Sequence, residues 1–210
     1  MSAKQLLEAL FDADRALRDA ESTLLAESDD EELARALEAA AKEAYGVDDA
    51  GEATARLARI ADLCAQAQGP RTADTLLYIL NHPSPDVRVA AGEALRDFAY
   101  DRYAEVARAI ERAFATDVSG PALAEVPWIL AEIGEPSALP LIARALKHRD
   151  VDVIASGIEA LAEMGDPEAI ALLEPLTKDK RVVQLEEGEA AYTTTIAELA
   201  EEAIGELEAR

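Results

Sequence analysis

A signal that occurs twice in the chain constrains its fold more than any other feature. Gly134 begins the triplet Gly-Glu-Pro, and Gly165 begins Gly-Asp-Pro 31 residues later. Between them lie a helical run, a charged turn and a second helical run. Helix pairs that repeat every 30–45 residues or so are typical of α-solenoids, in which each pair buries its apolar face on its neighbours. The sequence therefore predicts an all-α fold, a right-handed α-solenoid.

The second helices of three units align without gaps. They read VRVAAGEALRDF (87–98), ALAEVPWILAEI (122–133) and VIASGIEALAEM (153–164). Leu95, Leu130 and Leu161 share one position in this alignment. First helices are expected at 71–81, 102–115 and 136–147, and a further one at 166–177. The repeats are then about 70–100, 101–134, 135–165 and 166–210, in one continuous domain.

Residues 1–69 show no clear self-similarity to the rest and are expected to form a divergent helical cap. Residues 2–27 predict a long opening helix, and further helices are expected at 31–45 and 49–68. The opening helix carries one apolar stripe with spacings of 4, 3, 4, 3 and 4: Leu6, Leu10, Ala13, Leu17, Ala20 and Leu24. The stripe spans fewer than three heptads, which is short for a coiled coil. We expect it to cap the solenoid, with a weak dimer through this helix as the alternative.

The last unit is longer than the others. Leu161 aligns with Ile204, a spacing of 43, so about twelve residues are inserted. The segments 182–185 and 190–194 flank Glu-Glu-Gly-Glu and predict a short β-hairpin near 181–194. Thr195 and Glu198 have the spacing of a capping box, so a terminal helix is expected at 196–208.

Composition and charge exclude several classes of function. The chain has 43 Asp and Glu against 20 Lys and Arg, a formal net charge of −23. This excess repels nucleic-acid phosphates and anionic membranes. No segment approaches the ~18 apolar residues of a membrane span, and the N-terminus lacks a secretion-signal pattern. Cys64, the only cysteine, fits a buried thiol in a reducing compartment. We expect a cytoplasmic protein that binds neither nucleic acid nor membrane.

The residues that carry chemistry in other proteins form no such pattern here. The sequence has no nucleophile elbow, glycine-rich phosphate loop or zinc-type Cys/His spacing. The two histidines, His82 and His148, each follow a leucine by two residues at equivalent repeat turns. We expect them to be turn residues rather than a metal pair. The chain is expected to have no enzymatic activity, no metal and no cofactor.

The repeats resemble a known family, the HEAT repeats. The resemblance rests on Gly134-Glu-Pro-x-Ala-Leu and Gly165-Asp-Pro-x-Ala-Ile, with Ala-Leu-Lys-His and Glu-Ala-Leu-Ala-Glu-Met between them. The motifs Asp86-Val-Arg and Gly92-Glu-Ala-Leu are similar to the short bacterial subtype named after phycobilisome lyases. The resemblance covers about residues 71–179. Ile154 replaces the arginine of Asp86-Val-Arg in the third unit, so a regular Asp–Arg ladder is not expected.

The resemblance implies that the second helices line a concave surface. Trp128, the only tryptophan, aligns there with Glu93 and Glu159, and the next turn carries three more carboxylates. Two interpretations of Trp128 stay open: an exposed anchor on the concave surface, or a core residue beside Pro127. The candidate partner-binding residues are Glu93, Asp97, Trp128, Glu132, Glu159 and Glu163.

A basic edge forms a second candidate surface. Its residues stand at two successive inter-helix turns, about one repeat apart: Lys147, His148, Arg149, Lys178, Lys180 and Arg181. These cations complement the carboxyl ends of the first helices, where the helix dipole favours positive charge. The alternative is a site for an acidic peptide or another anionic ligand.

We therefore expect a non-enzymatic protein-interaction scaffold that binds a basic peptide or protein on an acidic concave face. The name of the similar subtype suggests one alternative, a bilin lyase or isomerase subunit. A third interpretation is an inhibitor or immunity protein that neutralises a cationic toxin.

Overall fold

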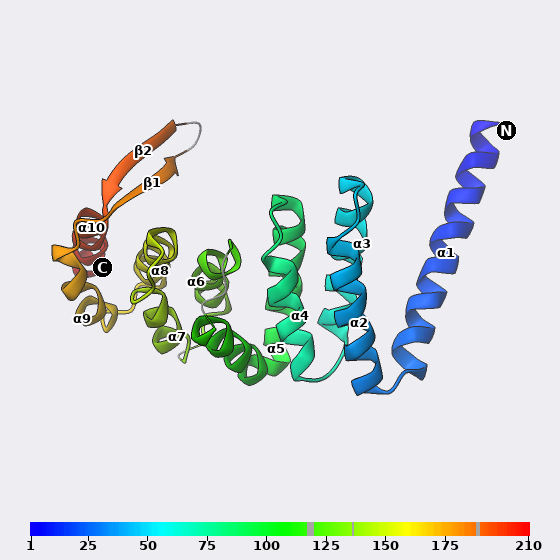
Figure 1. The fold of residues 1–210 in the computed structure, drawn as a ribbon, viewed down its shortest axis with the longest axis horizontal. Coiled ribbons are helices and arrows are strands. Elements are labelled where there is room, and N and C mark those ends of the chain that lie inside the picture. The colour runs from blue at the N-terminus through cyan, green and yellow to red at the C-terminus, as the bar shows by residue number, and fades with distance from the viewer. Residues whose placement is uncertain (117–119, 136, 188–189) are drawn as a thin grey trace.

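A computed structural model describes residues 1–116, 120–135, 137–187 and 190–210. Its elements in chain order are α1 (Ala3–Glu27), α2 (Asp30–Tyr45), α3 (Ala50–Gln66), α4 (Pro70–Leu80), α5 (Pro85–Ala115), α6 (Ala122–Ile133), α7 (Ala138–Ala145), α8 (Val151–Met164), α9 (Ala169–Leu173), the 3₁₀ helix η1 (Glu174–Lys178), β1 (Val182–Glu187), β2 (Ala190–Thr195) and α10 (Ile196–Ala209). The helices follow one another in an elongated row from α1 to α10 (Figure 1). The predicted all-α solenoid is confirmed. None of the helices described is long and apolar enough to cross a membrane.

The helices form two layers. In one layer, α3 contacts α5, α5 contacts α6, α6 contacts α8, and α8 contacts α10. We call these the inner helices, and the hairpin rises on their side of the row (Figure 1). In the outer layer, α2 contacts α4 and α5 contacts α7. The pairing of helices thus continues into α2 and α3, within the segment predicted to be the cap.

The long helix α5 belongs to both layers because it bends at Arg102, whose φ is −137° and ψ 37°. The predicted helices 87–98 and 102–115 are therefore joined without a loop. The sequence here lacks the Gly-x-Pro signal that separates the later units. A kink can turn the chain between two units only if other contacts hold it. The Arg102 guanidinium supplies two: it donates to the Ala67 carbonyl at 2.6 Å and lies over the Phe98 ring at 4.9 Å.

The repeated signal works through its glycines. Gly134 ends α6 and Gly165 ends α8, both with φ 68° and ψ 16°. This left-handed conformation stops a helix and is open to glycine at little steric cost. Pro136, the predicted start of the following first helix, lies outside the described residues.

The inserted segment forms the predicted hairpin. Strand β1 pairs antiparallel with β2, in a register that matches Val182 with Thr195 and Leu185 with Tyr192. Residues 188–189 of the predicted turn lie outside the described residues. The capping box that starts α10 is present, with Thr195 and Glu198 bonded reciprocally. The predicted helix 166–177 is shorter, because Pro175 has no backbone N–H for an α-helical bond and the chain tightens into η1.

One apolar core runs through the solenoid from Leu33 in α2 to Leu207 in α10. It is built mainly from Ala, Leu and Ile. Cys64 lies inside it, fully buried, and this burial raises the pKa of its thiol to about 12. A thiol held in this protonated form is a weak nucleophile.

Candidate binding surface on the inner helices

Three inner helices and the hairpin enclose a hollow of about 220 Å³. We call it the inner hollow. Two partly exposed aromatic rings border it: Trp128 of α6 is 39% exposed and Tyr192 of β2 is 43% exposed. Four carboxylates surround it: Glu159, Glu163, Glu202 and Glu206. Its apolar lining comes from Ile158, Ala162, Leu199 and Ala203. The hollow therefore offers aromatic, apolar and negatively charged surface side by side.

Helical spacing explains why one face of each helix supplies these groups. On α8, Glu159, Ala162 and Glu163 are three and four residues apart, so they share a face. On α10 the same spacing relates Leu199, Glu202, Ala203 and Glu206. The hairpin is inserted just before α10, and this position brings Tyr192 to the same hollow.

The carboxylates of the inner hollow have no basic partner. Among the residues that the structure describes, no Lys or Arg side chain forms an ion pair with any of the four. Arg210 comes near, but its guanidinium donates to the backbone carbonyl of Glu163. Glu159 is half-buried, and this burial raises the pKa of its carboxyl above the ordinary value of 4.5. The hollow thus holds negative charge that no Lys or Arg in the described part of the chain neutralises.

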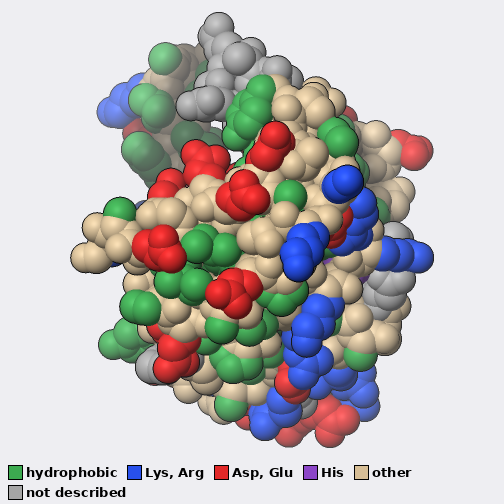
Figure 2. Space-filling model, turned by 90° about the vertical axis from the view of Figure 1, so that its left-hand side faces the viewer, with side chains coloured by type: hydrophobic (Ala, Val, Ile, Leu, Met, Phe, Trp, Pro, Cys, Tyr) green, Lys and Arg blue, Asp and Glu red, His purple; other side chains and the backbone are tan. Residues whose placement is uncertain are grey.

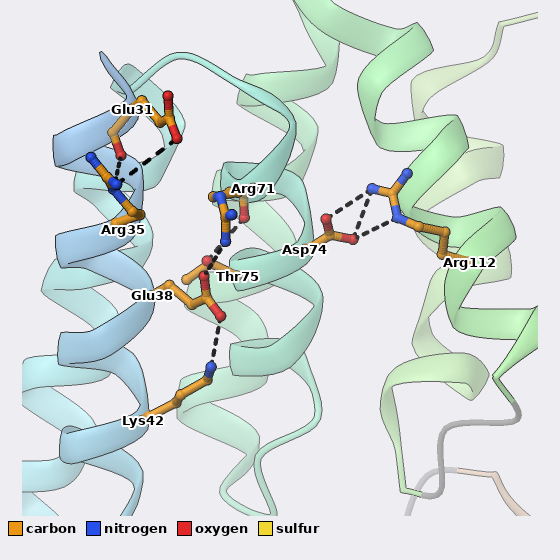
Figure 3. A network of polar contacts seen from close by, with 8 residues as sticks. All are labelled: Glu31, Arg35, Glu38, Lys42, Arg71, Asp74, Thr75 and Arg112. Atoms are coloured by element: carbon orange, nitrogen blue, oxygen red, sulfur yellow. Dashed lines mark hydrogen bonds and ion pairs between the residues drawn. The ribbon is translucent and has the colours of Figure 1, made fainter. Parts of the chain in front are cut away.

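The outer helices are different, because acids there pair with arginines of the next unit. The Nη1 atom of Arg71 lies 3.2 Å from Glu38, and the Arg112 guanidinium makes a bidentate contact with Asp74 at 2.8 Å (Figure 3). Arg144 continues the series with Glu111 at 2.8 Å. Exposed pairs of this kind contribute roughly 0–1 kcal/mol each to stability. Their larger effect is on charge, since they neutralise these three acids of the outer layer.

The six residues predicted for the concave surface do not all lie in one hollow. Trp128, Glu159 and Glu163 meet in the inner hollow. Glu132 lies in a neighbouring hollow, also bordered by Trp128, where it pairs with Arg96 at 2.7 Å.

Glu93 and Asp97 are exposed on α5 and lie outside the inner hollow. They lie close enough to Asp62 of α3 to raise the pKa of its carboxyl, although burial is the larger cause.

Sequence reasoning missed Tyr192, Glu202 and Glu206. The signal for two of them was present: the spacing of 43 that aligns Leu161 with Ile204 also aligns Glu159 with Glu202 and Glu163 with Glu206. Tyr192 lies in the inserted hairpin, where the repeat alignment has no equivalent position.

The neighbouring hollow is balanced in charge. It has a volume of about 240 Å³ and lies between α5 and α6. Arg88 pairs there with Glu125 at 2.8 Å, in addition to the Arg96–Glu132 pair. Arg88 thus contacts a glutamate of the next unit, 37 positions away. Of these two hollows, the inner hollow is therefore the one with an excess of negative charge.

The basic edge is present at two adjacent turns. The Nη1 atom of Arg181 donates to the Arg149 carbonyl at 3.3 Å, which brings these turns together. Arg181 also pairs with Asp179 at 2.6 Å, and its hydrogen bonds lower the pKa of the Asp179 carboxyl. The three lysines of this edge, Lys147, Lys178 and Lys180, are exposed. Figure 2, which views the C-terminal end of the solenoid, shows Lys and Arg gathered along one side and Asp and Glu spread over the rest.

The histidines make the same contact at equivalent turns. The Ser84 N–H donates to Nδ1 of His82 at 3.1 Å, and the Asp150 N–H donates to Nδ1 of His148 at 3.1 Å. Each imidazole packs edge-on against an aromatic ring, Tyr45 for His82 and Phe114 for His148. Within the described ranges, no group of three or more His, Cys, Asp or Glu side chains is placed to hold a metal ion.

The comparison with known protein families agrees with this architecture. A family model of HEAT repeats matches residues 113–191. Among solved structures, the chain is similar to an engineered protein from the Northeast Structural Genomics Consortium, with 18% sequence identity and a TM-score of 0.37, over 91% of this chain and 97% of that one. No curated protein matches the chain. The protein is thus an α-solenoid, and its residues 113–191 are similar to HEAT repeats.

Proposed function

We propose that the protein is a non-enzymatic interaction scaffold that binds a basic segment of another protein in the inner hollow. HEAT repeats generally mediate protein–protein interactions, which supports the scaffold role. One observation supports the choice of surface and partner. Trp128 and Tyr192 stand among four carboxylates that no Lys or Arg of the described chain neutralises.

Lysine and arginine side chains match this combination of groups. A cation over the face of a tryptophan or tyrosine gains about 0.5–2 kcal/mol, and more as water is excluded. The aliphatic stems of the same side chains suit the apolar lining between α8 and α10. The Glu159 carboxylate is costly to keep charged while half-buried, and an approaching cation would relieve that cost. Uncompensated charge also accelerates association with a basic partner.

The test must separate this hollow from the general acidity of the chain. We would measure the fluorescence anisotropy of a labelled Lys/Arg-rich peptide titrated with the full chain. A peptide with glutamine at every basic position serves as the first control. We expect Trp128→Ala to weaken binding of the basic peptide by about tenfold or more, because tryptophans at the centre of a contact are frequent hot spots.

A matched pair of charge variants completes the test. One variant changes Glu159, Glu163, Glu202 and Glu206 to Gln. The other changes the same number of exposed glutamates elsewhere: Glu168, Glu174, Glu201 and Glu208. We expect the first variant to lose binding and the second to keep it. Equal losses in both variants would mean that the peptide responds only to net charge, and the proposal would be wrong.

The finer resemblance to the phycobilisome-lyase subtype stays a prediction. Mixing the chain with a bilin and recording the absorbance spectrum tests it directly. A band shift that Trp128→Ala removes would replace the basic-peptide proposal with a tetrapyrrole site.

A further inference from the structure

Helix α1 exposes its apolar stripe to solvent. None of its 25 residues is buried. Six large apolar side chains of α1 are between 37% and 61% exposed: Leu6, Leu10, Leu17 and Leu24 of the stripe, and Leu7 and Phe11 outside it. Only its last turns are fastened, where Leu25 packs against the core and Glu21 pairs with Arg59 of α3 at 2.9 Å. Toward its N-terminus α1 leans away from α2 and α3 (Figure 1).

The chain's own α3 does not complement this stripe. The large apolar residues of α3, among them Leu57, Ile60 and Leu63, are already buried in the solenoid core. The α3 residues next to α1 are polar. Arg59 forms an ion pair with Glu21, and the charge of Glu21 helps to raise the pKa of the Asp62 carboxyl. A row of leucines gains little by packing on such a polar surface. We therefore expect the apolar stripe of α1 to pack against a partner other than α3.

We propose that this partner is a second copy of this chain, with the two α1 helices paired antiparallel about a twofold axis. In an antiparallel pair, the residue numbers that face each other have a constant sum. A sum of 30 places every stripe residue opposite another stripe residue. Leu6 then faces Leu24, Leu10 faces Ala20, and Ala13 faces Leu17. Two of the three layers thus match a large side chain with a small one, as interdigitating helices require.

Charge decides the orientation. Each copy has a net charge of −23, and the solenoid follows the C-terminal end of α1. A helix of this length is about 37 Å long at 1.5 Å per residue. An antiparallel pair therefore separates the two points of attachment by several times the Debye length of about 8 Å at physiological salt. A parallel pair would bring both acidic solenoids to the same end, where they repel each other.

The polar side of α1 does not oppose pairing. Its cations pair with acids of the same helix: Lys4 with Glu8 at 3.8 Å, Arg15 with Asp12 at 3.7 Å and Arg18 with Asp14 at 2.6 Å. In the proposed register the two Asp14 side chains come near the twofold axis. The Arg18 that each already holds neutralises them there.

The area available predicts how strong the dimer is. A face about 37 Å long and 12 Å wide offers about 450 Å² per copy, or about 900 Å² for the pair. Stable interfaces bury about 1,200–2,000 Å², so this contact belongs with the weak ones. The dimer should form reversibly at micromolar or higher concentration.

Sedimentation velocity of the full chain over a range from low micromolar to near-millimolar concentration tests the pairing. We expect a concentration-dependent shift from monomer to dimer. Leu17→Glu should raise the dissociation constant by about tenfold or more, since it places a charge in the seam. Ser22→Glu adds the same charge on the opposite, exposed side of α1 and should leave the dimer unchanged. Circular dichroism shows whether each variant keeps its helices. A chain that stays monomeric throughout, or a dimer equally stable in the Leu17→Glu variant, would overturn the proposal.

Cross-linking tests the register. An Ala13→Cys chain mixed with a Leu17→Cys chain should form a disulfide-linked heterodimer on mild oxidation. Neither variant alone should cross-link efficiently, because each new thiol then faces a native side chain. The native Cys64 is fully buried and does not compete. A homodimer disulfide in the Ala13→Cys variant alone would mean a parallel pair and would refute the antiparallel arrangement.

Discussion

The guanidinium of Arg102 donates a hydrogen bond across 2.6 Å to the carbonyl of Ala67, the residue that caps the C-terminus of α3. The last carbonyls of a helix have no partner within the helix, so Arg102 satisfies an acceptor that would otherwise depend on water. Arg102 is also the residue at which α5 leaves helical geometry. One side chain thus joins the end of one inner helix to the bend that carries the chain into the next unit.

We expect Arg102→Ala to reduce the free energy of unfolding by about 1.5–3 kcal/mol, the range for a hydrogen bond from a charged group. Urea denaturation of both proteins measures the difference. Arg108→Ala, an exposed position on the same helix without an ion pair in the described structure, is the control and should change stability by less than about 0.5 kcal/mol. If the two variants are equally stable, the contact with Ala67 does not hold the kink.

Two glycines in helix interiors should respond in opposite directions to alanine. At Gly157 of α8, a Cβ would lie 3.0 Å from Cβ of Ala145 and 3.1 Å from Cδ2 of Leu146, two buried residues at the C-terminal end of α7. Overpacking of about 1–3 kcal/mol then exceeds the gain in helix propensity, so Gly157→Ala should lower the melting temperature.

Gly205 of α10 is the matched case, because no atom lies within 4 Å of its added Cβ. Gly205→Ala should stabilise the protein by up to about 1 kcal/mol. Differential scanning fluorimetry compares both variants. Equal shifts of the same sign would show that α7 and α8 are not in close contact at Gly157.

Glu159 should make stability depend on pH. Because burial raises the pKa of this carboxyl above 4.5 in the folded state, the unfolded chain loses the proton first as pH rises. Burial of Glu159 therefore costs the folded state no stability below pH 4.5, and the cost appears as pH rises through the folded pKa. Glu159→Gln should raise the melting temperature at neutral pH and leave it unchanged below pH 4.5. Glu163→Gln, an exposed position one turn away, is the control and should have the smaller effect.

His82 should make stability depend on pH in the opposite direction. Burial, and to a lesser extent the charge of Arg88, hold the pKa of His82 below its ordinary value of 6.5. Protonation of Nδ1 would also break the bond from the Ser84 N–H. As pH falls below 6.5, the unfolded chain takes up the proton first, so the folded state loses stability until the folded pKa is passed.

Replacing His82 separates its hydrogen bond from its charge. His82→Leu should cost about 0.5–1.5 kcal/mol at neutral pH through the lost acceptor. His82→Asn keeps an acceptor two residues before Ser84, as in an Asx turn, and should retain most of the stability. Neither variant should show the loss between neutral pH and pH 5 or so that we expect of the parent chain. Urea unfolding at both pH values measures these differences.

Local signals carried much of the fold prediction. The alignment of second helices rested on leucines at one shared repeat position, and those leucines are buried. The spacing of 43 in the last unit revealed an insertion, which is the hairpin β1–β2. The candidate surface was less predictable. Repeat equivalence placed Glu132 beside Trp128, but equivalence does not show that Arg96 of the preceding helix neutralises Glu132.

By itself, the sequence determined which units repeat and where helices with a local stop or capping signal end or begin. A left-handed glycine such as Gly165, or a capping pair such as Thr195 and Glu198, acts through backbone groups only a few residues away. The tertiary structure alone decided which side chains share a surface. Trp128, Glu159 and Tyr192 meet because α6, α8 and the hairpin stack side by side, and this depends on the packing of whole helices. The same packing pairs the outer acids with arginines 33 to 38 residues away and leaves the carboxylates of the inner hollow unpaired.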